Sequence, residues 1–438
     1  MTRRHACALL AAFTALIIAV SAGIYLVARQ ASARPEARDT SLSGGRVPHN
    51  PAAPASTGTW VGSWAAAPSG AEPGTEPTGF AGRSVRNIVH TSAGGSAARV
   101  TLSNHYGQLP LRITSASVGV AARDNAAEAL PDTLRPLTFS GVPAVTVPPG
   151  GQVVSDAVAL RVPADGDLLI TTYSPTPSGP VTYHRHARQI SYVATGDHVL
   201  DPRALAYTEP TPHWRYVTAL DVLSKDARGT VVVIGDSLTD GITSTTGQNA
   251  RWTDVLAERL DFRHGVANAG ISGNQLLTDG LGRPADSPSG LNRFERDALS
   301  RPNTKAVVVV LGINDILRDP DGTPDPAAVT AGLRALVSRA HARGVPVVGA
   351  TLMPFGGHTG YDAVRESARQ AVNTEIRRGE IFDAVLDLDA ALRDPYAPRR
   401  LAGHLDSGDH LHLNDAGYRR MAQRFDTGVL SRGTTATL

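Results

Sequence analysis

Residues 230–241 read TVVVIGDSLTDG, and this stretch decides how the rest of the chain is interpreted. Residues 230–234 are apolar at nearly every position, which is typical of a central parallel strand buried on both faces. The run ends in Gly235-Asp236-Ser237, a turn that presents the serine hydroxyl at the edge of the sheet. That placement suits a nucleophile, because nearby backbone N–H groups can stabilise a developing oxyanion. Taken alone, Ser237 could equally be a helix-capping serine.

The region after Gly229 alternates between short apolar runs and helical patterns. Strands are predicted at 230–234, 266–268, 306–311, 345–351 and 384–388. Helices are predicted at 252–260, 291–299, 327–342, 361–378 and 415–425. This order predicts an α/β fold, in which helices cover both faces of a parallel sheet and the site lies at the carboxyl ends of its strands.

The region before Lys225 has a different pattern, with short alternating runs separated by Gly and Pro. Strands are predicted at 98–103, 111–114, 116–120, 142–147, 152–160, 168–173 and 189–193. Many short strands and almost no helical pattern predict an all-β sandwich, of jelly-roll type. We therefore expect a β domain over 59–226 and an α/β domain over 227–432.

Three further segments with polar or glycine residues follow later strands of the α/β region. Residues 268–274 read NAGISGN and contain Gly273, residues 312–315 read GIND and contain Asn314, and residues 409–414 read DHLHLN. Together with Ser237 they supply a hydroxyl, a glycine amide, a carboxamide and an Asp-x-x-His pair at one edge of the sheet. This joint occurrence is far more specific than any one segment. The Gly-x-Ser-x-Gly sequence of ordinary α/β-hydrolases is not found around Ser237.

These four segments resemble the blocks of the SGNH hydrolases, also called the GDSL family of esterases and lipases. The resemblance covers roughly residues 230–428, with Leu413 where the family often has proline. It implies a flavodoxin-like three-layer α/β/α fold and hydrolysis of an ester through an acyl-enzyme.

The resemblance also implies a role for each matching residue. Ser237 is expected to be the nucleophile, His412 the general base and Asp409 the residue that orients the imidazole. The backbone N–H groups of Ser237 and Gly273 and the side chain of Asn314 are expected to form the oxyanion hole. No cofactor and no metal is expected, and Asp236 is expected to brace the turn.

Several alternatives compete with these assignments. His410 and His412 lie near Asp406 and Asp409, so a metal site is a rival interpretation, although it leaves Ser237 without a role. Asp406 is the main rival of Asp409 as the orienting carboxylate. On a strand, His184 and His186 would share one face, and we expect them on an exposed face of the β sheet. Trp60, Trp64 and Trp214 are expected to be buried aromatic residues rather than platforms for sugar stacking.

The first residues predict export from the cytoplasm. Arg3 and Arg4 precede an apolar run over residues 6–28, and Ala31-Ser32-Ala33 offers a cleavage site. This is the layout of a signal peptide over residues 1–33 or of an uncleaved membrane anchor. Residues 34–58 are rich in Ala, Pro, Ser and Gly and predict a flexible linker. The one cysteine, Cys7, excludes a disulfide framework.

The charge balance of the chain argues against nucleic acid as a binding partner. The chain has 42 Lys+Arg against 40 Asp+Glu, so no strongly basic face for nucleic acid is indicated.

The β region is similar to the amino-terminal region of exported actinobacterial GDSL-type hydrolases, a resemblance carried by residues 60–65 and 86–92. We expect a secreted serine esterase that acts on short-acyl or carbohydrate esters. The alternatives are a lipase or lysophospholipase of the same fold, and a cell-surface glycan-binding protein with a degenerate hydrolase half.

Overall fold

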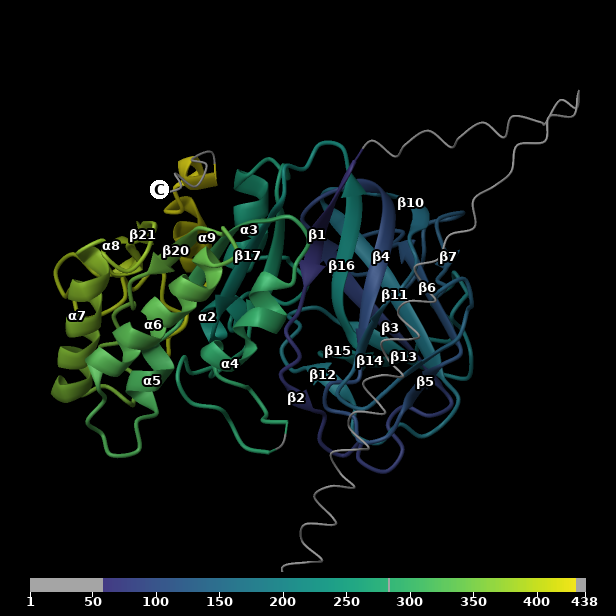
Figure 1. Cartoon of the computed structure of the whole chain (residues 1–438), viewed down its shortest axis with the longest axis horizontal. Coiled ribbons are helices and arrows are strands. Elements are labelled where there is room, and N and C mark those ends of the chain that lie inside the picture. The colour runs from purple at the N-terminus through teal and green to yellow at the C-terminus, as the bar shows by residue number, and fades with distance from the viewer. Residues whose placement is uncertain (1–57, 283, 431–438) are drawn as a thin grey trace, which may run out of the picture. The chain divides into compact units, whose positions relative to one another are not determined.

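The computed structural model describes residues 58–282 and 284–430 (Figure 1). The predicted signal segment and almost all of the predicted linker lie outside the described residues. Within the described part we find no helix with the length and hydrophobicity of a transmembrane span.

The α/β half is built on a five-stranded parallel sheet with the strand order β18-β17-β19-β20-β21. The strands are β17 (Thr230–Gly235), β18 (Gly265–Gly270), β19 (Thr304–Val310), β20 (Val347–Ala350) and β21 (Ala384–Leu386). The first strand along the chain thus lies between the second and the third, which is the flavodoxin-like order. The predicted α/β fold with a parallel sheet is confirmed.

Helices cover both faces of this sheet (Figure 1). They are α2 (Ser237–Asp240), α3 (Trp252–Arg259), α4 (Gly290–Phe294), α5 (Ile313–Leu317), α6 (Pro326–His341), α7 (Ala363–Arg377), α8 (Leu388–Leu392) and α9 (Asp415–Gln423). A π-helical turn, Glu295–Leu299, continues α4, so the helix predicted over 291–299 changes type part-way. A 3₁₀ turn, Thr427–Leu430, follows α9.

The side chains of β17 show why the strand needs cover on both sides. All six of its residues are buried. Val232 and Ile234 belong to a core with α6 and α7, whereas Val231 and Val233 belong to a core with α3 and α9. Successive side chains of a strand point to opposite faces, so a continuous apolar run requires two hydrophobic layers.

The β half consists of antiparallel sheets, and every element described in it is a strand. One sheet has the order β1-β16-β4-β10, with β9 also paired to β4. Its strands are β1 (Thr59–Ala65), β4 (Gly95–Ser103), β9 (Gln152–Val154), β10 (Val158–Val162) and β16 (Val217–Ser224). The strand predicted over 152–160 is therefore two strands, and both of them pair with β4.

A second sheet has the order β14-β13-β3-β11-β6-β7. Its strands are β3 (Arg83–Thr91), β6 (Ser115–Val120), β7 (Arg135–Pro136), β11 (Gly166–Ser174), β13 (Ser191–Thr195) and β14 (Glu209–Thr211). Smaller pairings involve β2 (Gly70–Ala71), β12 (Thr182–His184), β15 (Trp214–Arg215), β5 (Leu111–Ile113) and β8 (Val145–Val147). An all-β region is confirmed, while its jelly-roll connectivity stays a prediction.

One hydrophobic core joins the two larger β sheets, with Val61, Leu102 and Leu220 from one and Val89 and Ile170 from the other. Trp64 and Trp214 lie in this core with their rings edge-to-face at 4.8 Å, as expected for buried aromatic residues. Trp60 is only partly buried, and the Arg99 guanidinium lies 4.5 Å from its ring centroid.

The two halves meet along β1, and the described residues of both belong to one compact unit. The Gly62 N–H donates to Thr230 Oγ1 at 2.9 Å, and Ala65 lies in the hydrophobic core of the α/β half. A Cβ atom on Gly265 of β18 would lie 1.9 Å from the Gly62 carbonyl oxygen. The close approach of the two halves therefore depends on glycine at this position.

Gly265→Ala is expected to lower the free energy of unfolding by about 1 to 3 kcal/mol, because β1 and β18 must move apart to admit the methyl group. Urea denaturation would measure the change. Gly403→Ala is the matched control, since a Cβ at Gly403 meets nothing within 4 Å. Equal stability of the two variants would contradict the prediction.

Candidate active site

Ser237 is the first residue of α2, separated from the end of β17 by one residue. The Asp236 side chain caps this short helix by accepting a hydrogen bond from the Leu238 N–H at 3.0 Å. Gly241 ends the helix in the left-handed conformation, at φ 87°. The Ser237 side chain is held at the sheet edge with only 8% of the residue exposed.

The loop that precedes α9 brings an imidazole to this serine. His412 Nε2 lies 2.8 Å from Ser237 Oγ, and His412 Nδ1 lies 2.6 Å from Asp409 Oδ2. A carboxylate only accepts hydrogen bonds, so Nδ1 carries the proton and Nε2 presents its lone pair to the serine hydroxyl. This arrangement can remove a proton from Ser237.

Asp409 is held by its own loop as well as by the imidazole. Its Oδ1 accepts hydrogen bonds from the backbone N–H groups of Leu411 and His412, at 3.0 and 2.7 Å. Partial burial opposes ionisation, but the hydrogen bonds from His412 and Leu411 hold the pKa of Asp409 well below its usual range. Asp406, the rival carboxylate, instead accepts from His410 Nδ1 at 2.6 Å.

The two other predicted site residues follow the neighbouring strands. Gly273, after β18, has φ 77°, and a Cβ there would lie 2.3 Å from Nη2 of Arg318. The positive φ favours glycine at this position, and the Arg318 guanidinium would have to move to admit a Cβ atom. Asn314, after β19, is 7% exposed, and its Nδ2 lies 3.4 Å from Asp236 Oδ2. This contact turns the amide nitrogen of Asn314 towards the turn that carries Ser237.

Two buried carboxylic acids organise the floor of the site. Burial raises the pKa of Asp236 to about 7, against the hydrogen bond from the Leu238 N–H, and Asp315 adds to the rise. Burial also raises the pKa of Asp315, which accepts from the backbone N–H groups of Leu276 and Leu277 at 2.7 and 2.9 Å. Asp315 thereby connects α5 to the loop that follows Gly273.

Arg293 of α4 is a structural residue that the sequence pattern did not reveal. It is 1% exposed and donates hydrogen bonds to the carbonyl oxygens of Gly235 and Ala269, at 2.8 and 2.6 Å. It also donates to Asn274 Oδ1 at 2.9 Å. One guanidinium therefore holds the carboxyl ends of β17 and β18 and the loop of Gly273 together.

The expectation that His184 lies on an exposed sheet face is wrong. His184 is 5% exposed, and its Nε2 lies 2.8 Å from Oδ1 of Asp240, the last residue of α2. β12 ends at His184, so the half-buried His186 lies outside the strand, and the α/β half covers the side chain of His184. The pair joins the β half to the helix that begins with Ser237.

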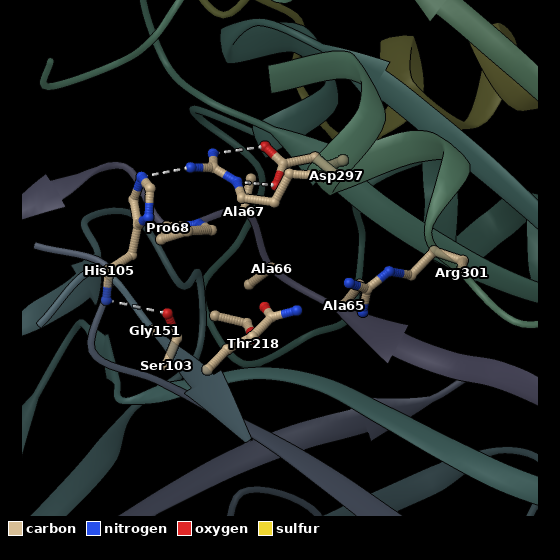
Figure 2. Close-up of a pocket in the computed structure, with 14 residues that line it drawn as sticks. Ala65, Ala66, Ala67, Pro68, Ser103, His105, Gly151, Thr218, Asp297 and Arg301 are labelled. Carbon is tan, nitrogen blue, oxygen red and sulfur yellow. Dashed lines mark hydrogen bonds and ion pairs between the residues drawn. The ribbon is translucent and has the colours of Figure 1, made fainter. Parts of the chain in front are cut away.

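Two cavities lie near these elements. Figure 2 shows one between the β half and the π-helical turn, lined by Ala67, Ser103, Thr218, Asp297 and Arg301 among others. None of the predicted site residues lines it. The second is small and mostly apolar, adjoins Asp236 and Leu238, and is lined by Ile313, Leu352, Met353 and Leu411 among others.

A metal site around His410 and His412 was the rival interpretation. Over the described ranges, no group of three or more His, Cys, Asp or Glu side chains is placed to hold a metal ion. The two histidines are each paired with a different aspartate.

The family model of the GDSL-like lipase/acylhydrolases matches residues 233–420, which contain Ser237, Gly273, Asn314, Asp409 and His412. These residues form a GDSL-like lipase/acylhydrolase domain. The resemblance seen in the sequence is confirmed for this half, and the resemblance of the β half stays a prediction. No curated protein matches the chain.

Solved structures similar to this domain include three hydrolases. An alpha/beta hydrolase from the metagenome of Lake Arreo, Spain, is 23% identical, with a TM-score of 0.36, and the match covers 47% of this chain and 96% of that one. A carbohydrate acetylesterase from Sinorhizobium meliloti is 16% identical, with a TM-score of 0.36, and the match covers 44% of this chain and 94% of that one. A GDSL-like lipase from Bacteroides thetaiotaomicron is 16% identical, with a TM-score of 0.34, covering 46% and 88%.

Asp236→Asn is expected to weaken the pH dependence of stability. The folded-state pKa of about 7 lies above the ordinary value of 3.8, so the folded chain binds an extra proton between these values. The free energy of unfolding of the wild type should therefore fall as pH rises from 5 to 7. This decrease should exceed that of the variant by on the order of 2 kcal/mol. Urea unfolding at both pH values would measure this, with exposed Asp132→Asn as control. The same pH dependence in wild type and Asp236→Asn would refute it.

Proposed function

We propose that this protein is a serine esterase of the GDSL type, with Ser237 as nucleophile, His412 as general base and Asp409 as its orienting carboxylate. The observation that carries the proposal is the continuous hydrogen-bonded series from Ser237 Oγ through His412 to Asp409. The family match supports hydrolysis of an ester as the reaction class.

The reaction has two stages. His412 Nε2 takes the proton from Ser237 while Oγ attacks the ester carbonyl carbon, and a tetrahedral oxyanion forms. As the intermediate collapses, the bond to the alcohol breaks and His412 returns the proton to the leaving oxygen. Water, deprotonated by His412, then attacks the acyl-enzyme, and the carboxylic acid leaves as Ser237 recovers its proton.

The oxyanion would be held by three groups on three strand-end segments. These are the backbone N–H of Ser237, the backbone N–H of Gly273 and the side-chain amide of Asn314. In the described part of the chain, the Gly273 N–H donates to no protein acceptor. Asp236 accepts from one N–H of the Asn314 amide and leaves the other for the substrate.

We further propose that the substrates carry short acyl groups, carbohydrate esters among them. The support is the sequence, in which no long apolar segment that could form a lid stands out near Ser237. A lipase or lysophospholipase activity is the alternative within the same fold, and a glycan-binding protein without turnover is the alternative outside it.

We also propose that the protein is exported. The support is the sequence alone, a basic start and an apolar run over residues 6–28. Cleavage after Ala33 would release the protein, while an uncleaved segment would anchor it to the membrane.

Ser237→Ala is expected to lower kcat/KM on p-nitrophenyl acetate by about 1000-fold or more, because the nucleophile is lost. Initial rates over p-nitrophenyl esters from acetate to palmitate would measure turnover and the chain-length optimum. Full activity in the variant would refute the serine mechanism. An optimum at long acyl chains would favour the lipase alternative, and wild-type inactivity on every ester would favour the glycan-binding protein.

Asn314→Ala is expected to lower kcat by about 100- to 1000-fold with a small effect on KM, since the amide donates to the oxyanion. Steady-state kinetics on p-nitrophenyl acetate would test this. Asn292→Ala is the control, because Asn292 is an exposed asparagine of α4. If both variants kept wild-type kcat, Asn314 would have no place in the oxyanion hole.

A further inference from the structure

His184 links the β half to the α/β half through both nitrogens of its ring. His184 Nδ1 lies 2.8 Å from the carbonyl oxygen of Ala67, and Nε2 lies 2.8 Å from Oδ1 of Asp240. Both side chains of the pair are buried, with 5% and 3% of their surface exposed. The Trp214 ring covers the imidazole, at 5.5 Å between centroids.

With Asp240 ionised, this geometry places a proton on both ring nitrogens of His184, which makes the ring an imidazolium. A carbonyl oxygen only accepts, so Nδ1 must carry a proton, and Nε2 faces a carboxylate oxygen that also only accepts. A neutral ring would direct a lone pair at the carboxylate. Although burial opposes the charge, Asp240 and the Ala67 carbonyl raise the pKa of His184.

Asp240 continues the connection towards Gly273. Its second oxygen, Oδ2, accepts a hydrogen bond from the Ser272 N–H at 2.9 Å. The next residue is Gly273, and Asp240 itself ends the helix that begins with Ser237. The backbone of Asp240 also lies against Gly270, where a Cβ would be 2.3 Å from the Asp240 nitrogen.

One carboxylate therefore ties together three parts of the molecule. Its two oxygens bind His184 from the β half and Ser272 from the loop after β18, and its backbone belongs to the helix of Ser237. If His184 lost its charge, Asp240 would keep a buried negative charge with only a backbone N–H as its partner. A carboxylate in that state would turn towards water or take up a proton.

We propose that His184 is a positioning residue of the active site, which holds Asp240 so that the loop of Gly273 presents its N–H to the substrate oxyanion. The β half then contributes one positioning residue, His184, to the active site of the other half. This inference rests on the esterase function proposed above. It assigns to one residue of the β half an effect on kcat.

Other titratable and charged groups lie near the His184–Asp240 pair and affect the pKa of His184. Arg251 lies close enough to lower the pKa of His184, after the larger effects of burial and Asp240. His186 and His213 also interact with His184 electrostatically, and burial lowers the pKa of both. The imidazolium of His184 is thus present below its raised pKa and is lost as pH rises through it.

His184→Gln is the first test, in the full chain. The amide cannot carry the positive charge, so kcat on p-nitrophenyl acetate should fall between about 10- and 100-fold while KM stays within about threefold. Glu72→Gln is the matched control, because Glu72 and Arg215 form a buried ion pair, at 2.5 Å, inside the β half. It should lower stability without changing the kcat of the folded enzyme.

The pH dependence of kcat in Asp240→Asn is the second test, because a purely structural role of His184 would not change it. In this variant, the amide oxygen can still accept from Ser272, and the amide nitrogen can donate to a neutral His184 ring. The wild type should lose kcat at alkaline pH as His184 deprotonates, and Asp240→Asn should not show this loss. Rates followed at the isosbestic wavelength of p-nitrophenol would give both profiles.

Hydrogen–deuterium exchange supplies an arm that is independent of activity. Peptides covering residues 271–274 should exchange faster in His184→Gln than in wild type. In Glu72→Gln their exchange rate should equal that of the wild type. The inference is overturned if His184→Gln is folded and keeps the wild-type kcat, pH profile and exchange. Failure of the esterase proposal is separate, because it would show as activity retained in Ser237→Ala, and the exchange result would still decide whether His184 holds the loop.

Discussion

The position of β17 between β18 and β19 is the constraint on which the site depends. The carboxyl ends of these three parallel strands lie at one edge of the sheet, so Ser237, Gly273 and Asn314 come together although they are far apart in the sequence. The hydrophobic cores on both faces fix β17 in this place. The loop of Asp409 and His412 then approaches the same edge.

Buried polar contacts convert this rough meeting point into a defined geometry. Arg293 holds the ends of β17 and β18, Asp315 holds the segment after Gly273, and Asp240 connects that segment to α2. Burying such polar groups is costly unless they are hydrogen-bonded, so these contacts must be in place when the fold is assembled. The same contacts therefore position the site and connect the elements of the domain.

The β half contributes to this network in a way that its own pattern does not predict. Its alternating strands indicated a sandwich, and two antiparallel sheets with a shared core are present. The same alternation predicted His184 on an exposed sheet face, whereas its side chain is buried. The cover is α2 of the other half, brought there by the close approach of β1 to β17 and β18.

The sequence by itself determined the order of strands and helices in the α/β half, the family of that half and the five residues expected to carry the chemistry. The element order follows from local patterns, because a strand buried on both faces must be apolar at nearly every position. The family and the five residues follow from short motifs that stand at the ends of such strands. Only the tertiary structure decided which aspartate meets His412, which backbone conformation Gly273 adopts, and that His184 pairs with Asp240. Those facts depend on side chains from distant segments meeting in three dimensions, and no local spacing encodes such contacts.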